Sequence, residues 1–284
     1  MAPTINDLLI KSEQRLQDVD SPRLSAEVLL VEVLGCSRLS LYIERDRMIS
    51  AEQLELFHAL VSRREQGEPL AYILGQKEFY GLDFIVSSET LIPRPETEHL
   101  VETVEELFDE SAAFHFVDLG TGSGIIAVVL ANIFKKSSGI AVDLSSEALA
   151  VAKKNAIAHR VDKRLEFIRG DFTEPLFEKS IFDLVVSNPP YVPQHEYDAA
   201  SVEVTGFEPV SALVSGVNGL DHIHAMLPHV SDILKQGGFF LMEIGYQQAG
   251  MIKRIVTNEF REFKIVSVIK DLARHDRIVM LQKI

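Results

Sequence analysis

Short apolar runs recur between residues 114 and 281, and stretches with helical spacing of apolar residues follow most of them. Such runs are typical of strands buried on both faces, and their alternation with helices predicts a parallel sheet covered by helices on both sides. The predicted strands are Phe114–Asp118, Gly139–Asp143, Leu165–Arg169, Phe182–Ser187, Gly238–Glu243, Lys264–Ile269 and Arg277–Leu281. The predicted helices are Ile125–Phe134, Ser146–His159, Leu220–Leu234 and Gln248–Asn258. Only D-L-A-R-H-D joins the last two strands, so we expect that pair to be antiparallel.

Residues 1–74 have a helical pattern throughout. Asp20-Ser21-Pro22 combines a capping residue with a proline at a helix start, and Ser50-A-E-Q53 has the spacing of a capping box. Residues 75–92 then alternate aromatic and polar side chains around Gly81, which predicts a β-hairpin. We therefore expect a helical domain at 1–74, a hairpin linker at 75–92 and an α/β domain at 93–284.

The net charge of −14 restricts the class of partner. Binding to a nucleic-acid backbone depends on clustered Lys and Arg, and the densest basic group here is only R160-V-D-K-R164. The single cysteine, Cys36, rules out an internal disulfide and fits a reducing compartment. The apolar stretch Ile125–Ala131 is far shorter than the ~20 residues that span a bilayer, and the N-terminus lacks a signal-peptide pattern. We expect a cytoplasmic monomer without membrane or direct nucleic-acid contacts.

The first strand of the α/β region ends in a glycine loop, V-D-L-G-T-G-S-G-I-I-A, with Asp118 two residues before Gly120. Glycines at a strand-to-helix turn let the backbone approach a ligand closely. The dinucleotide fingerprint requires glycine where this chain has Ile125. A loop beside an acid suits a ligand with a cationic end better than a pyrophosphate. S-adenosylmethionine, which carries an ammonium and a sulfonium, is such a ligand.

The next two strands end in further polar candidates. Asp143 can accept hydrogen bonds from ribose hydroxyls, Asp171 can accept the adenine amine, and Phe172 can lie against the ring. Each has a simpler explanation as a helix cap or loop residue, but three successive strand ends in the right order favour a cofactor site. Its candidate residues are Asp118, Gly120, Thr121, Gly122, Ser123, Gly124, Asp143, Asp171, Phe172 and Asn188.

The fourth strand ends in Asn188-Pro189-Pro190-Tyr191, where two prolines remove two backbone donors in succession. The side-chain oxygen of Asn188 and the carbonyl of Pro189 can accept the two N–H bonds of a planar amide or aromatic amine. Tyr191 can stack on the flat group. Asn188, Pro189 and Tyr191 are the catalytic candidates, and Pro190 joins them as a substrate-binding candidate. The simpler explanation is a stiff proline turn.

Taken together, these motifs make the chain resemble the PrmC/HemK family, the N5-glutamine methyltransferases of class I peptide-chain release factors. Besides the glycine loop and N-P-P-Y, the resemblance includes E68-P-L-A-Y-I-L-G, L91-I-P-R-P-E-T-E, E208-P-V-S-A-L and D271-L-A-R-H-D-R. It implies a Rossmann-like fold with a seven-stranded, mostly parallel sheet, a small N-terminal helical bundle and a hairpin linker. This chain departs from the family at Arg274, where glycine is usual, and at Phe172, often tryptophan.

The resemblance also implies a reaction. S-adenosylmethionine would donate a methyl group and leave as S-adenosylhomocysteine, with Gly120–Gly124, Asp143, Phe172 and Asn188 contacting it. Asn188–Tyr191 would hold a glutamine amide, and the helical domain would help to dock the release factor. Two alternatives stay open: an adenine-N6 nucleic-acid methyltransferase that holds its planar amine with the same Asn-Pro-Pro-Tyr segment, and a non-catalytic adaptor. The acidic charge argues against the first, and the intact cofactor loop and clamp against the second.

Several polar residues have no assigned role at this stage. His222, His224 and His229 are near Asp221, but helical geometry turns His222 and His224 to different faces, so no metal site is expected. Glu243 ends the fifth strand and could orient a ligand or a loop, or serve as a cap. Arg94 and Glu96 could fasten the hairpin over the cofactor or pair with each other.

Overall fold

The computed structural model describes residues 2–284, and these form two compact units. The first contains the chain up to Gln76 together with Ser201–Phe207, and the second contains Lys77–Ala200 and Glu208–Ile284. The helices of the first unit are α1 (Ile5–Arg15), α2 (Pro22–Leu34), α3 (Arg38–Ile43), α4 (Ala51–Glu65), α5 (Leu70–Leu74) and the inserted α10 (Val202–Phe207).

Capping boxes fix the starts of α1 and α4, whereas Ser21 precedes α2 without a side-chain capping bond. The Thr4 hydroxyl accepts the Asp7 amide while the Asp7 carboxylate accepts the Thr4 amide, and Ser50 and Gln53 form the same reciprocal pair. The segment 201–207 is held in this unit by a salt bridge of 2.5 Å between Glu203 and Arg64, whose side chain is buried. No pattern in the sequence had assigned 201–207 to the helical part.

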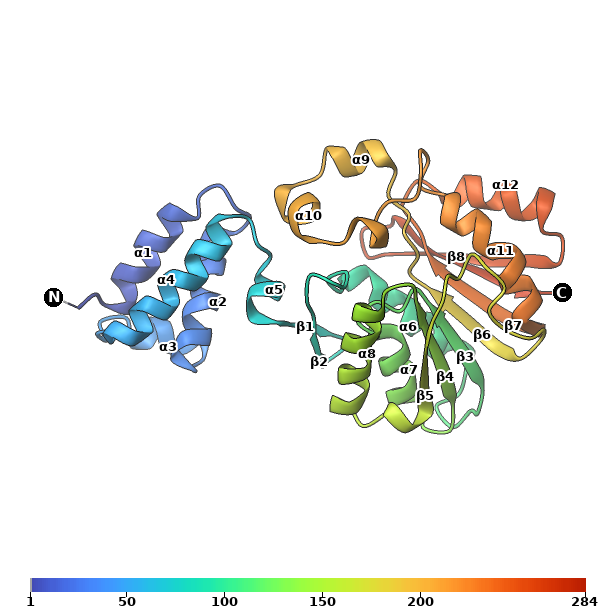
Figure 1. Cartoon of the computed structure of the whole chain (residues 1–284), viewed down its shortest axis with the longest axis horizontal. Coiled ribbons are helices and arrows are strands. Elements are labelled where there is room, and N and C mark those ends of the chain that lie inside the picture. Colours follow the sequence, from blue (N-terminus) through green and yellow to red (C-terminus); the bar gives the residue numbers. More distant parts are fainter. Residues whose placement is uncertain (1) are drawn as a thin grey trace. The chain divides into compact units, whose positions relative to one another are not determined.

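A hairpin of β1 (Gln76–Phe79) and β2 (Leu82–Ile85) has all its residues but Gln76 in the second unit, which continues into an alternating α/β arrangement (Figure 1). Its sheet has the strand order β5-β4-β3-β6-β7-β9-β8. The strands are β3 (His115–Leu119), β4 (Ser138–Asp143), β5 (Leu165–Arg169), β6 (Phe182–Ser187), β7 (Leu234–Glu243), β8 (Phe263–Lys270) and β9 (Asp276–Lys283). The α-helices of this unit are α6 (Glu98–Leu107), α7 (Ile125–Ile133), α8 (Ser146–Ala158), α9 (Gln194–Asp198), α11 (Asp221–Ile233) and α12 (Ala249–Glu259). Short 3₁₀ turns are η1 (Pro95–Thr97), η2 (Asp162–Arg164) and η3 (Val210–Ala212).

The direction of the strands follows from their connections. β3 pairs in parallel with β4 and β6, and β6 in parallel with β7, because helices join these strands. The short final link makes β8 and β9 antiparallel, as the sequence predicted. The seven-stranded, mostly parallel sheet is therefore confirmed. The carboxyl ends of β3, β4, β5 and β6 consequently meet at one edge of the sheet.

Each face of the sheet has its own core. Phe116 on β3 points into a cluster with Val104 of α6 and Leu130 of α7, whereas the next residue, Val117, points into a cluster with Ile223 of α11 and Ile252 of α12. This alternation is the period of two that strands impose, and it explains why the strands are apolar on both sides. The two cores hold the strand ends, and so the site, in fixed register.

The backbone of the final hairpin shows why the family usually has glycine where this chain has Arg274. The φ of Arg274 is +66°, in the left-handed region that glycine adopts without cost. We expect Arg274→Gly to raise the free energy of unfolding by about 0.5–1 kcal/mol, because it removes this backbone strain. Urea denaturation would measure the change. Arg261→Gly, at an exposed position without positive φ, is the control and should lower stability; equal effects of both substitutions would contradict the explanation.

Candidate functional site

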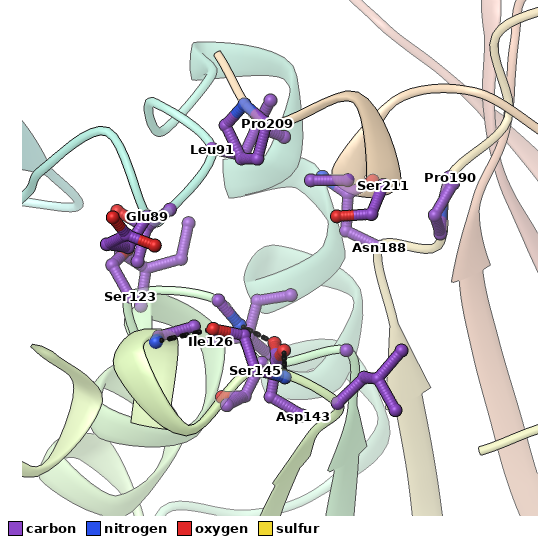
Figure 2. Close-up of a pocket in the computed structure, with 18 of the residues that line it drawn as sticks. Glu89, Leu91, Ser123, Ile126, Asp143, Ser145, Asn188, Pro190, Pro209 and Ser211 are labelled. Carbon is purple, nitrogen blue, oxygen red and sulfur yellow. Dashed lines mark hydrogen bonds between the residues drawn. The ribbon is translucent and has the colours of Figure 1, made fainter. Parts of the chain in front are cut away.

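A cavity of about 350 Å³ lies at the carboxyl ends of β3–β6 (Figure 2). Its walls combine backbone and side chains from segments that are far apart in the sequence. They are residues 89–94, Thr97, 120–123, 125–126, 143–145, 147–148, 171–173, Asn188, Pro190, Pro209, 211–212 and His222. Four carboxylates, on Glu89, Asp143, Glu147 and Asp171, stand against one arginine in this set, so the cavity suits a cationic ligand better than a phosphate.

The glycine loop forms one wall. Gly120 and Gly122 have φ of +76° and +55°, which side-chain-bearing residues rarely adopt, and a Cβ on Gly120 would come within 3.4 Å of the Phe172 ring. Thr121 and Ser123 line the cavity beside them. Gly124 does not belong to the lining set: its φ is +83°, and a Cβ there would lie 3.0 Å from the Cβ of Ala152. The third glycine thus serves the packing of α7 against α8.

Asp143 holds the glycine loop from the neighbouring strand. One of its oxygens accepts the Gly122 amide at 2.8 Å and the other accepts the Ser145 amide at 2.9 Å. Burial raises the pKa of Asp143, and these backbone hydrogen bonds act in the opposite direction. A carboxylate has about four lone-pair positions, so Asp143 retains acceptor capacity toward a ligand hydroxyl. Figure 2 shows it on the cavity floor next to Ser145.

The wall from β5 brings together Asp171, Phe172 and His222. One oxygen of Asp171 accepts the hydroxyl and amide of Thr173, and the Thr173 hydroxyl is the largest influence that holds the pKa of Asp171 below its usual range. The Phe172 ring meets His222 edge-on at 6.0 Å between centroids. His222 is fixed by Ser215, which lies 2.8 Å from its Nδ1. The sequence analysis considered His222 only with His224 and His229 as a metal group, and gave it no role in the cofactor site.

Asp118 lies behind the glycine loop and is fully buried, outside the cavity lining. Its Oδ2 accepts the Thr121 hydroxyl at 2.7 Å and the Ala127 amide at 3.3 Å. Burial raises the pKa of Asp118 to about 7. The residue therefore shapes the loop and the start of α7, while Thr121 stands between it and the cavity.

The Asn188–Tyr191 segment follows β6, and only some of its residues line the cavity. Asn188 and Pro190 line the cavity, whereas Pro189 is buried outside the lining set, and Tyr191 lines a neighbouring cavity of about 280 Å³. The backbone carbonyl of Tyr191 accepts the side-chain amide of Gln248 at 2.8 Å. Stacking of Tyr191 on a substrate and acceptance of an N–H by the Pro189 carbonyl stay predictions.

A buried chain of hydrogen bonds supports this segment. Nδ2 of Asn188 donates to Oγ1 of Thr97 at 3.1 Å, and the Thr97 hydroxyl donates to Oε2 of Glu243 at 2.6 Å. The Tyr191 hydroxyl donates to the other Glu243 oxygen at 2.8 Å. Thr97 and Glu243 are both fully buried. The sequence had left Glu243 without a role and had not singled out Thr97.

Two walls of the cavity are fastened to each other by Glu208. Its carboxylate accepts the Ile92 amide at 3.2 Å and pairs with Arg94 at 2.5 Å. Of the two interpretations of Arg94, the one in which it pairs with Glu96 is wrong, since its salt-bridge partner in residues 2–284 is Glu208. Segment 89–94 is thereby tied to the segment that begins at Glu208, and both segments contribute to the cavity wall.

Asn155 fixes the glycine loop from α8. Its Nδ2 donates to the carbonyls of Ser123 and Ile85, and its Oδ1 accepts the Ile85 amide at 2.8 Å. It is buried, and each of these bonds crosses a long separation in sequence. No motif signals such a residue, because its partners are set by the packing of α8 against the hairpin.

Within residues 2–284, no group of three or more His, Cys, Asp or Glu side chains is arranged to hold a metal ion. His224 instead pairs with Glu259 at 2.8 Å on the surface. None of the helices in the described part of the chain is long and apolar enough to cross a membrane.

The residues of the large cavity fit S-adenosylmethionine by their chemistry. Two carboxylates at consecutive strand ends retain lone pairs for hydroxyls or an amine, and Phe172 offers an aromatic face. The loop around Gly120 and Gly122 leaves space that a Cβ would occupy. When bound, this cofactor supplies a methyl group on a cationic sulfur.

Comparisons with known proteins point to one family. The PrmC N-terminal domain matches residues 7–75, and the methyltransferase small domain matches residues 95–206. A release factor glutamine methyltransferase of Nitratidesulfovibrio vulgaris is 45% identical over 282 residues, covering 99% of this chain and 95% of the relative. One from Koribacter versatilis is 43% identical, covering 90% of this chain and 91% of the relative.

A solved structure shares the fold alone. The crystal structure of a methyltransferase from Pyrococcus furiosus matches with a TM-score of 0.51 at 17% identity, covering 73% of this chain and 91% of that one. The sheet, the helical N-terminal part and the near full-length relatives agree with the family that the motifs indicated. The chain belongs to the PrmC/HemK family, the release factor glutamine methyltransferases.

Proposed function

We propose that this enzyme transfers a methyl group from S-adenosylmethionine to N5 of a glutamine in class I peptide-chain release factors, in their Gly-Gly-Gln loop. The observation that carries the proposal is the position of Asn188 and Pro190 on the same cavity as the glycine loop, Asp143 and Phe172. The near full-length relatives named for this activity support the choice of acceptor. Working with release factors, the enzyme would act in the cytoplasm, and we expect it to do so as a monomer.

We infer the following roles for residues of this chain in the reaction. The amide nitrogen of glutamine is planar and a poor nucleophile, because its lone pair is delocalised into the carbonyl. Oδ1 of Asn188 and the Pro189 carbonyl accept its two N–H bonds, which orients the lone pair and makes it more available. The bound cofactor would supply the methyl group to this nitrogen from its sulfonium sulfur and would leave as S-adenosylhomocysteine. The nitrogen then loses a proton, for which no strong base is required.

The cavity also explains how the cofactor would be held. Asp143 would accept hydrogen bonds from the ribose hydroxyls, Asp171 would accept one from the adenine amine, and Phe172 would lie against the adenine ring. The bonds of Glu208 to Ile92 and Arg94 tie residues 89–94 to the segment 208–212, and both segments contribute to the cavity wall. The helical domain would dock the release factor.

Transfer of labelled methyl to three purified acceptors tests the proposal. These are a class I release factor, its variant with the loop glutamine changed to alanine, and duplex DNA as the acceptor of the adenine-N6 alternative. We expect label on the intact release factor alone. Label on DNA, or equal label on both forms of the release factor, would refute the proposed acceptor.

A further inference from the structure

The hydrogen bonds around Thr97 have a fixed direction. A hydroxyl carries one proton, and Thr97 donates it to Oε2 of Glu243 at 2.6 Å. What Thr97 can offer Asn188 is therefore a lone pair, which accepts an N–H. Only the Nδ2 end of the Asn188 amide can supply that bond, and it does so at 3.1 Å.

The carboxylate of Glu243 sets the direction of these hydrogen bonds. Both of its oxygens accept hydrogen bonds, from Thr97 and from the Tyr191 hydroxyl. Burial raises the pKa of Glu243, whereas the two donated hydrogen bonds and the charge of Arg277 favour its ionised form. Burial is also the largest influence that raises the pKa of Tyr191, so the phenol keeps its proton and acts as the donor.

The consequence appears at the other end of the Asn188 amide. Because Nδ2 faces Thr97, Oδ1 is the end of the amide left for the cavity that Asn188 lines. An amide turned by 180° would present N–H bonds to the substrate's own N–H bonds and could not hold it. Whether Asn188 presents its oxygen or its NH₂ group to the substrate thus depends on Thr97, which lies 91 positions earlier in the chain.

We propose that Thr97, held by Glu243, is a positioning residue that fixes the Asn188 amide with Oδ1 toward the methyl acceptor. Glu243 is shared with Tyr191, so the same carboxylate sets both ends of the Asn-Pro-Pro-Tyr segment. This inference rests on the proposed function, but it can be tested apart from it.

A double-mutant cycle provides the first test. Thr97→Val keeps the shape and removes the hydroxyl, and we expect it to lower kcat about 30-fold while KM for the release factor changes less than about threefold. Thr97→Ser retains the hydroxyl and should stay within about threefold of wild type in kcat. In an Asn188→Ala background the Val substitution should have almost no effect on kcat, since its target is gone.

The outcomes separate positioning from a general structural role. Equal losses for Thr97→Val with and without Asn188, or equal losses for the Val and Ser variants, would overturn the proposal. S-adenosylmethionine affinity within about threefold of wild type would show that the Val variant retains its cavity.

A second measurement needs no turnover. The side-chain amide signal of Asn188, identified by its loss in the Asn188→Ala spectrum, should shift in Thr97→Val and stay in place in Thr97→Ser. An unmoved signal in Thr97→Val would overturn the positioning role. Because this readout is independent of the acceptor, it still decides the inference if wild-type enzyme transfers no label and the proposed function fails.

Discussion

Replacing Asn188 with alanine is expected to lower kcat for methyl transfer to a release factor about a thousandfold. Removal of one preorganised hydrogen-bonding group from a reacting centre costs on the order of 10²–10³ in rate. Asn188 is half-buried on the cavity wall, and its orientation is set by Thr97, so the acceptor is preorganised in this sense. A single-turnover assay with saturating cofactor measures the methyl-transfer step itself.

Two controls separate a loss of the methyl-transfer step from a general effect on the enzyme. Asn258→Ala removes the same side chain from an exposed position on α12 and should leave kcat unchanged. Binding of S-adenosylmethionine to Asn188→Ala should weaken far less than kcat falls, because the glycine loop, Asp143 and Phe172 remain. A loss of kcat below tenfold would mean that Asn188 does not hold the acceptor nitrogen.

Local patterns predicted the frame of this site. The glycine loop, Asp143, Asp171 and Asn188 each follow an apolar run, and strand ends of a parallel sheet must meet at one edge. The structure brings Gly120, Thr121, Gly122, Ser123, Asp143, Asp171, Phe172, Asn188 and Pro190 to one cavity. These residues were predictable because each lies within a few positions of the strand that carries it to the cavity.

Residues that depend on tertiary contacts were not predictable in this way. Thr97 and Glu243 are separated by 146 positions, and Ile92 and Glu208 by 116, so no local pattern links them. Asp118, Gly124, Pro189 and Tyr191 were also expected at the site, and none of the four lines the cavity at the carboxyl ends of β3–β6. Asp118 and Gly124 instead shape the glycine loop and the packing of α7, whereas acceptance of an N–H by the Pro189 carbonyl and stacking by Tyr191 stay predictions. The start of β7 was also missed. The strand was predicted to begin at Gly238, whereas it begins at Leu234 and pairs with β6 through a register shift.

Asp118 should make stability depend on pH. Its pKa rises from an ordinary value of 3.8 to about 7 in the folded chain, so the folded state binds a proton more tightly than the unfolded state. The stability this contributes is fully present below pH 3.8 and is lost as pH rises toward 7. The cause is structural: Oδ1 of Asp118 is a buried side-chain oxygen for which residues 2–284 provide no hydrogen-bond partner.

Asp118→Asn should remove this dependence. The amide oxygen can accept from Thr121 and Ala127 as Oδ2 does now, and the side chain carries no charge at any pH. The free energy of unfolding of the variant, relative to wild type, should therefore rise by about 2 kcal/mol between pH 5.5 and 8. Urea denaturation at pH 5.5, 7 and 8 measures it.

Asp171→Asn is the matched control, since the pKa of Asp171 lies below 3.8 and the group stays ionised across this range. Its difference from wild type should be constant from pH 5.5 to 8. The same constancy in Asp118→Asn would show that Asp118 does not titrate there.

The raised pKa of Asp118 should also affect cofactor binding. A cationic ligand in the cavity favours the ionised form of a nearby carboxyl, and Asp118 is one hydrogen bond behind the wall residue Thr121. Binding of S-adenosylmethionine at pH 7 should then release a fraction of a proton, which calorimetry in buffers of different ionisation enthalpy detects. Asp118→Asn should abolish that release. Proton release that persists in the variant would assign it to another group, whereas its loss would identify Asp118 as the carboxyl that ionises when the cation binds.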